Sequence, residues 1–135
     1  MAHQFEEYHT ESSIGYHLHS VYKNAKINGS MFEDGLTHYL SATTMVVETW
    51  GRPLDKSWCE KGKQVLNSQT IRVDGVAWNE ADDHSKWVSV PSRYACFGDL
   101  NHMSSQWKRG GAFFCLSDPY ILKAMTQVIE SYDRC

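Results

Sequence analysis

Two short stretches organise this sequence: Asp82-Asp83-His84-Ser85-Lys86-Trp87 and, downstream of it, Gly98-Asp99-Leu100-Asn101. His84 and Lys86 are two residues apart, and side chains two residues apart on an extended segment point to the same side. One phosphate group could therefore contact both side chains. Together the stretches give the pattern His-x-Lys, a gap and Gly-x-x-Asn, in which Asn101 supplies an amide. This pattern favours a phosphate site.

Both stretches are expected at the ends of β-strands. His84–Val90 alternates between polar and apolar residues as a strand does, and Pro91 stops it. Tyr94–Phe97 begins the next strand. A loop over Asn101–Gly111 follows, and Ala112–Leu116 is expected as a short strand. The candidate phosphate-binding side chains thus belong to strand termini.

Two helices are predicted outside this region. Ser30-Met31-Phe32-Glu33 has the spacing of a capping box, and apolar residues at helical intervals follow over about 31–41. Asp118 suits an N-cap and Pro119 a first helical residue. An apolar stripe then repeats at helical spacing, which predicts a helix over about 119–132.

The remaining elements define the fold class. Apolar, β-branched runs predict strands at Met45–Trp50 and Val65–Val73. Strands interleaved with two helices predict an α+β layered domain with a mixed β-sheet. Residues 1–29 are interpreted as a poorly defined lead-in that contains one expected strand, Ile14–Val21. The domain itself is expected to span residues 30–135.

Composition excludes several classes of protein. With 135 residues, of which 41% are hydrophobic, the chain can form the core of one domain. The formal net charge of -3 gives no general attraction to polyanions, so nucleic-acid binding would need a local basic patch. No run approaches the roughly 18 apolar residues of a membrane-spanning helix. Met1–Val21 is polar, so no signal sequence is expected within it.

The four cysteines favour disulfides over a metal site. Cys59, Cys96, Cys115 and Cys135 lack the Cys-x-x-Cys spacing of zinc sites. An even, widely spaced set predicts two disulfides, which persist in oxidising compartments. The sequence alone allows three pairings.

Two weaker patterns concern metal binding and glycosylation. His17 and His19 could share a strand face and bind a metal, but no third ligand is evident and chance alternation is the favoured interpretation. Asn28-Gly29-Ser30 matches an N-glycosylation acceptor, which is meaningful if the protein is secreted. No metal or cofactor is expected.

The spacing of the two opening stretches resembles the signature of the phospholipase D superfamily. Within it, Asp83–Trp87, Cys96–Asn101 and Arg109-Gly110-Gly111 resemble the C-terminal half of deoxyribonuclease II. The resemblance implies a phospholipase D-like layered domain that carries a single His-x-Lys half. It also implies the disulfides Cys59 to Cys135 and Cys96 to Cys115.

The resemblance assigns catalytic roles to His84, Lys86 and Asn101. In the superfamily, one histidine attacks phosphorus and forms a phosphohistidine, while a second histidine from a matching half protonates the leaving group. His84 is by resemblance one of that pair, with Lys86 and Asn101 on phosphate oxygens. Asp82 or Asp83 could orient the imidazole, as a carboxylate does for other catalytic histidines.

Further residues are candidates for substrate binding. Asp99 fits the Gly-Asp-x-Asn form of the deoxyribonuclease II branch. Lys108 and Arg109 belong equally well to a solvated loop or to a clamp for flanking phosphates. Trp107 in this loop could stack on an unpaired base. His102 is interpreted as a surface residue.

Two departures from the pattern leave the mode of action open. Pro91 stands where the superfamily has an aspartate, and only one His-x-Lys is present, whereas deoxyribonuclease II has two. The chain is thus either a fragment or reduced member that lacks the other half, or a symmetric homodimer that brings together two copies of His84. We favour the homodimer.

The resemblance implies a secreted or lysosomal acid endonuclease that hydrolyses DNA without a metal and leaves 3′-phosphate ends. The alternative is a catalytically reduced, secreted relative that binds DNA or a protein partner. No association with a membrane is expected.

Overall fold

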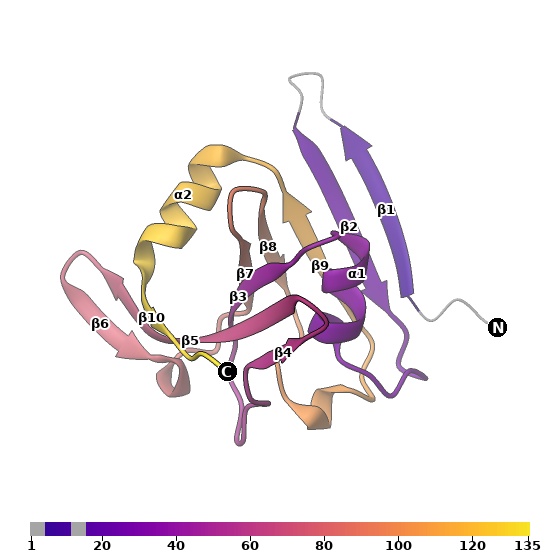
Figure 1. The fold of residues 1–135 in the computed structure, drawn as a ribbon, viewed down its shortest axis with the longest axis horizontal. Coiled ribbons are helices and arrows are strands. Elements are labelled where there is room, and N and C mark those ends of the chain that lie inside the picture. The colour runs from indigo at the N-terminus through magenta and orange to yellow at the C-terminus, as the bar shows by residue number, and fades with distance from the viewer. Residues whose placement is uncertain (1–4, 12–15) are drawn as a thin grey trace.

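The computed structural model describes residues 5–11 and 16–135, and within them ten strands form one sheet (Figure 1). The main path through the sheet runs β1 (Phe5–Glu11), β2 (His17–Lys23), β9 (Gly111–Leu116), β8 (Tyr94–Gly98), β7 (Trp87–Val90), β3 (Thr44–Glu48), β5 (Lys63–Val73), β10 (Ile129–Tyr132). Two further strands, β4 (Trp58–Glu60) and β6 (Val76–Asn79), also pair with β5. β3 and β5 are parallel, whereas β3 and β7 are antiparallel. The predicted α+β class with a mixed sheet is therefore confirmed.

Helical segments pack on both faces of this sheet. A wide π-helical turn over Met31–Leu36 continues into α1 (Thr37–Tyr39), and both lie on one face. The helix α2 (Pro119–Val128) lies on the other face, which Figure 1 shows. Because successive strand residues point to opposite faces, Cys96 of β8 joins the main core while Ala95 packs against α2.

The helix starts follow the predicted capping residues. The Ser30 hydroxyl accepts hydrogen bonds from the backbone N–H groups of Phe32 and Glu33. The Asp118 carboxylate does the same for the N–H groups of Tyr120 and Ile121. These side chains satisfy amide groups that would otherwise lack partners in the first helical turn.

The end of the second helix was predicted wrongly. α2 ends at Val128 instead of 132, since the next four residues form β10 and pair with β5. Ile129 lies opposite Ile71 in this pairing, and Tyr132 lies opposite Ser68. The apolar residues that extended the helical stripe in sequence are thus used at the edge of the sheet.

The N-terminal region contributes two strands. The strand expected at Ile14–Val21 is present as β2, although Ile14 lies outside the described residues. β2 pairs with β9 along its length, and Val21 is fully buried. The strands β1, β4 and β6 were not predicted, because their short sequences show little periodicity. The division of the chain at residue 30 stays a prediction.

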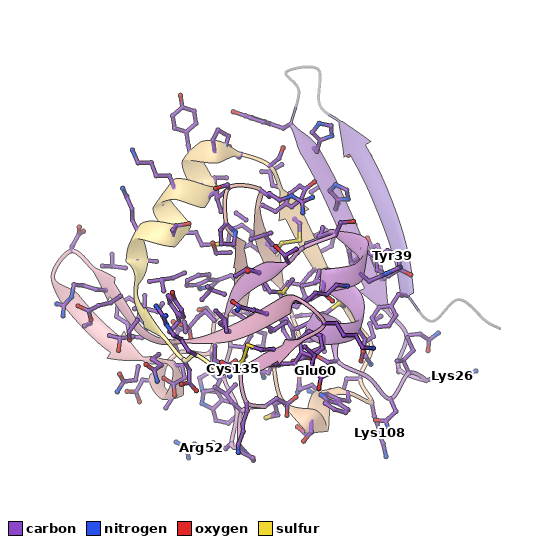
Figure 2. The ribbon with its side chains drawn as sticks, in the orientation of Figure 1. Lys26, Tyr39, Arg52, Glu60, Lys108 and Cys135 are labelled. Carbon is purple, nitrogen blue, oxygen red and sulfur yellow. A yellow bond between two sulfur atoms is a disulfide. The ribbon has the colours of Figure 1, made fainter. Side chains whose placement is uncertain are left out.

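Both predicted disulfides are present. Cys96 and Cys115 lie directly opposite each other on β8 and β9. Cys59 of β4 is joined to Cys135, which Figure 2 labels close to Glu60. The second bond links residues 76 positions apart and ties the C-terminus to the edge of the sheet. None of the described helices is long and apolar enough to span a membrane.

Candidate active site

His84 and Lys86 lie in a loop and not on a strand, which corrects the predicted start of the strand. β7 begins at Trp87, and residues 83–86 have no regular structure. The Asp83 carboxylate accepts hydrogen bonds from the Ser85 backbone N–H and the Trp78 indole N–H, both at 2.8 Å. The Lys86 ammonium donates to the His84 carbonyl oxygen at 2.7 Å. Local hydrogen bonds therefore shape this loop.

The Asp83 carboxyl is held in its ionised form. Burial opposes ionisation, but the hydrogen bonds from Ser85 and Trp78 and the charge of His84 outweigh it, so the pKa of Asp83 lies below its ordinary value. The exposed His84 side chain thus lies next to a fixed negative charge.

Trp50 connects His84 to Asn101. It lies two residues beyond the end of β3, and its indole ring is stacked on the His84 imidazole with ring centroids 4.5 Å apart and planes 20° apart. Its backbone N–H donates to the Asn101 side-chain oxygen at 3.1 Å. Its indole N–H donates to the Ala81 carbonyl oxygen at 3.1 Å. The two predicted site stretches, which carry His84 and Asn101, therefore meet at Trp50, a residue that the sequence placed only at the end of an apolar strand.

The Gly98–Asn101 stretch is fixed against the loop. The Gly98 N–H donates to the Lys86 carbonyl oxygen at 3.1 Å. A Cβ atom at Gly98 would lie 2.5 Å from the Phe113 ring, so only glycine fits this approach. The Asp99 carboxylate accepts from the Ala112 N–H at 2.9 Å and is otherwise exposed. The two opening stretches of the sequence are thus brought together by β7 and β8.

The interpretation of His102 as a surface residue is wrong. Its side chain is fully buried, with Nδ1 2.7 Å from the Asn67 side-chain oxygen and Nε2 hydrogen-bonded to the Glu33 carboxylate. Its backbone N–H donates to the Thr49 hydroxyl at 2.9 Å. His102 therefore anchors the segment that carries Asn101 to the residue after β3, to β5 and to the first helical turn.

The Glu33 carboxyl in this network is also ionised. Burial opposes ionisation, but hydrogen bonding and charge interaction with His102, together with the hydrogen bond with Ser30, lower the pKa of Glu33 below its ordinary value. The other oxygen of Glu33 is buried without a hydrogen-bond partner among the described residues.

Glu48 is a buried acid on the other face of the sheet from Glu33 and His102, because it alternates along β3 with Val47 of the main core. Its side chain is fully buried and accepts a hydrogen bond from the Ser68 hydroxyl. Its backbone lies opposite that of Trp87 in the pairing of β3 with β7. Burial raises the pKa of Glu48 to about 7; the hydrogen bond from Ser68 opposes this, and the charges of Asp83 and Glu80 reinforce it. No sequence signal distinguished this glutamate from an ordinary strand residue.

The basic loop is held by a buried lysine. Lys108 and Arg109 are exposed, whereas Trp107 is half-buried and donates its indole N–H to the Asp55 carboxylate at 2.8 Å. The ammonium group of Lys23 lies beneath this loop and donates to the carbonyl oxygens of Ile27, Trp107 and Arg109.

Desolvation lowers the pKa of Lys23, and the charge of Asp34 partly opposes this. In Figure 2, Lys26 and Lys108 point outward from the same corner of the molecule. The Lys23 ammonium therefore holds in place the loop that carries Lys108 and Arg109. These two residues and Lys26 form an exposed basic corner.

Replacing Lys23 by methionine should lower the free energy of unfolding by about 2 kcal/mol, because three carbonyl oxygens lose a charged donor. Urea denaturation measures this change. Lys26→Met, at an exposed position, is the control and should change stability by less than about 0.5 kcal/mol. Equal effects of the two substitutions would contradict the anchoring role of Lys23.

No metal centre is apparent in the part of the chain that the structure describes, where no group of three or more His, Cys, Asp or Glu side chains could hold an ion. His17 and His19 lie on β2, and the His19 ring nitrogen Nε2 is 3.1 Å from the Tyr94 hydroxyl. Asn28 is exposed.

The fold and the site define an α+β domain in which one His-x-Lys loop lies against a Gly-Asp-x-Asn segment. The family model described as deoxyribonuclease II matches residues 2–135. The chain therefore belongs to the deoxyribonuclease II family.

Several relatives are similar over most of this chain. Plancitoxin-1 of Acanthaster planci and deoxyribonuclease-2 of Caenorhabditis elegans are each 32% identical to it in alignments that cover 93% of this chain. Deoxyribonuclease-2-alpha of Sus scrofa is 28% identical in an alignment that covers 92% of this chain. The matched regions cover 36%, 34% and 35% of these relatives, so the chain spans about a third of their length.

Proposed function

We propose that this protein hydrolyses phosphodiester bonds of DNA without a metal, as a deoxyribonuclease II-type endonuclease. The observation that carries the proposal is that Trp50 contacts both the His84 ring and the Asn101 amide, while the Gly98 N–H donates to the backbone carbonyl of Lys86. Membership of the deoxyribonuclease II family supports it. The phospholipase D-like arrangement of layers is part of the same proposal.

In the proposed reaction one histidine attacks phosphorus and the 5′-oxygen leaves. The second histidine donates a proton to that oxygen, which gives a 5′-hydroxyl end. Water then hydrolyses the phosphohistidine, and the 3′-phosphate end is released. Lys86 offers positive charge and Asn101 an amide donor to the phosphate oxygens. Asp83 is suited to orient the loop that carries His84, since it fixes the Ser85 backbone.

Substrate would be held along the basic corner. Lys108 and Arg109 are exposed cations that can contact flanking phosphates. Asp99, beside Gly98, would contact substrate next to the cleaved bond. Trp107 is half-buried, and we assign stacking on an unpaired base to the exposed part of its side chain.

An acidic, oxidising compartment fits these features. The proposed leaving-group step needs a protonated imidazole, and a free imidazole is half protonated near about pH 6.5. The buried Glu48 also favours acid pH, because its pKa is about 7. The two disulfides fit secretion or a lysosomal location, where the exposed Asn28 could carry a glycan.

The second histidine would come from a second copy of the chain. A two-fold axis near His84 would bring two imidazoles to one phosphate. Exposed aromatic rings close to the candidate site support a protein contact there: Phe97 adjoins Gly98 and pairs across strands with Phe114, whose ring meets Tyr22 edge-on.

Binding without turnover is the second candidate function. It is favoured by a pocket of about 490 Å³ beside the His84 loop, with Asp83 and Ser85 at its polar end. Its apolar lining includes Ile71, Trp78, Trp87, Phe97, Ile121 and Met125. Such a pocket can hold an apolar group of a partner.

Plasmid cleavage separates the two functions. The purified protein should nick supercoiled plasmid in the presence of a chelator, and faster at about pH 5 than at about pH 7.5. The 5′-hydroxyl ends should accept phosphate from a kinase without prior phosphatase treatment. A requirement for magnesium would exclude the phosphohistidine reaction, and DNA binding without any cleavage would favour the second function.

A further inference from the structure

We infer that Trp50 is a positioning residue that holds the His84 imidazole and the Asn101 amide in their relative places. The inference rests on the proposed function for its consequence in catalysis. The geometry of the three residues, however, can be tested without DNA cleavage.

The first contact is between rings. The 4.5 Å separation and 20° angle describe nearly parallel, stacked rings. His84 is exposed and lies in a loop without regular structure, so a stack on a half-buried indole restricts the directions in which the imidazole can point. The indole is itself fixed because its N–H donates to the Ala81 carbonyl oxygen of the preceding turn.

The second contact is between the backbone of Trp50 and the side chain of Asn101. The Trp50 N–H donates to the amide oxygen of Asn101, so the amide NH₂ group remains available as a donor. In the proposed site, this NH₂ group donates a hydrogen bond to a phosphate oxygen. The same residue thus fixes the imidazole through its ring and the orientation of the amide through its backbone.

A nearby cation gives the indole a further electrostatic role. The guanidinium carbon of Arg52 lies 5.7 Å from the centroid of the Trp50 ring, within the range of a cation–π contact. Figure 2 shows Arg52 at the edge of the molecule, and its side chain is exposed. The negative face of an indole is attractive to cations, so the stack with His84 is compatible with a protonated imidazole.

Positioning of this kind affects turnover more than binding. A misplacement of about 1 Å in a reacting group can reduce the rate about 10²-fold. Trp50→Leu removes the ring but keeps the backbone N–H, so Asn101 retains its contact while His84 loses its stack. Trp50→Phe keeps a smaller ring and loses only the indole N–H. The two variants therefore separate the ring from the hydrogen bond.

The test combines NMR with kinetics on the full chain. The imidazole protons of His84 are assigned by their loss in His84→Asn, and the indole ring current should shift them upfield in the unsubstituted protein. Trp50→Leu should abolish this shift, and Trp50→Phe should reduce it. The control for general loss of packing is Trp58→Leu, since Trp58 of β4 is partly buried against the main core. This substitution should leave the upfield shift of the His84 signals unchanged.

Kinetics provide the second readout. Trp50→Leu should lower kcat for plasmid cleavage about 10²-fold with little change in KM, and Trp50→Phe should restore most of the loss. If the unsubstituted protein cleaves no plasmid, titration with inorganic phosphate is followed on the His84 signals instead. The apparent Kd should then change little in Trp50→Leu, whereas the shift of the His84 signals on phosphate binding should differ from that in the unsubstituted protein.

A His84 spectrum that is identical in the unsubstituted protein, Trp50→Phe and Trp50→Leu would overturn the inference. Equal losses of activity in Trp50→Leu and Trp58→Leu would also overturn it, because the effect would then reflect stability. If Trp50→Leu does not fold, the inference is tested by Trp50→Phe alone, and an unreduced upfield shift of the His84 signals in that variant would overturn it. Absence of cleavage in the unsubstituted protein would count against the proposed function, while the spectra would still test Trp50.

Discussion

Glu48→Gln should make the protein more stable at about pH 8 by on the order of 3 kcal/mol, and should change its stability little at about pH 5. Glutamine keeps the size of the side chain and can exchange hydrogen bonds with the Ser68 hydroxyl. Urea denaturation at a series of pH values measures the difference.

The sign follows from proton binding. The pKa of Glu48 rises from 4.5 to about 7 on folding, so the folded state binds the proton more tightly than the unfolded chain does. Stability from this group is fully present below about pH 4.5 and is lost as the pH rises to about 7. Above that pH the folded protein must hold a buried carboxylate near Asp83 and Glu80, and Glu48→Gln removes this charge.

Glu33 provides an internal contrast. Its pKa is lowered on folding, so its contribution is present above its unfolded pKa and is lost as the pH falls. Glu33→Gln should therefore destabilise the protein at neutral pH, opposite to Glu48→Gln. Glu60→Gln, at an exposed position, is the control and should leave the pH profile unchanged. If the free energy of unfolding depends on pH in the same way in Glu48→Gln and in the unsubstituted protein, the pKa of Glu48 is not raised on folding and the prediction is wrong.

Local sequence signals correctly predicted the elements that local chemistry determines. Ser30 and Asp118 cap the helical segments because their side chains reach amide groups two and three residues ahead. The apolar runs in β3 and β5 are strands because they are buried between helical layers. The start of β7 was missed for a local reason, since the Asp83 side chain bonds to the Ser85 backbone and competes with the sheet.

The parts of the site that were missed depend on residues far apart in sequence. His102 is buried because Glu33 and Asn67, 69 and 35 residues away, supply its partners. Trp50 reaches Asn101 across 51 residues. A histidine or a tryptophan next to a predicted strand gives no sign of such contacts. The sequence thus indicated which groups could bind phosphate, whereas the fold was needed to identify the residues that hold them.

His84→Ala should reduce plasmid cleavage at least about 10³-fold, because it removes the proposed nucleophile or the proposed acid. The side chain is exposed, so the change in stability should stay within about 1 kcal/mol, including the loss of its stack on Trp50. His38→Ala is a matched control: His38 is also exposed and contacts an aromatic ring, Tyr39, with centroids 4.9 Å apart. It should leave cleavage unchanged.

The proposed homodimer predicts how variants of His84 and Lys86 behave when they are mixed. If one phosphate lies between two copies, a mixture of His84→Ala and Lys86→Ala chains should remain inactive, because no dimer then carries two complete pairs. Phe97→Asp should dissociate the dimer and abolish cleavage together, since the exposed Phe97 ring adjoins the proposed axis. Sedimentation at assay concentrations gives the oligomeric state. Cleavage by a strictly monomeric protein would rule out the composite site, because a single imidazole cannot both attack phosphorus and protonate the leaving oxygen from the opposite side.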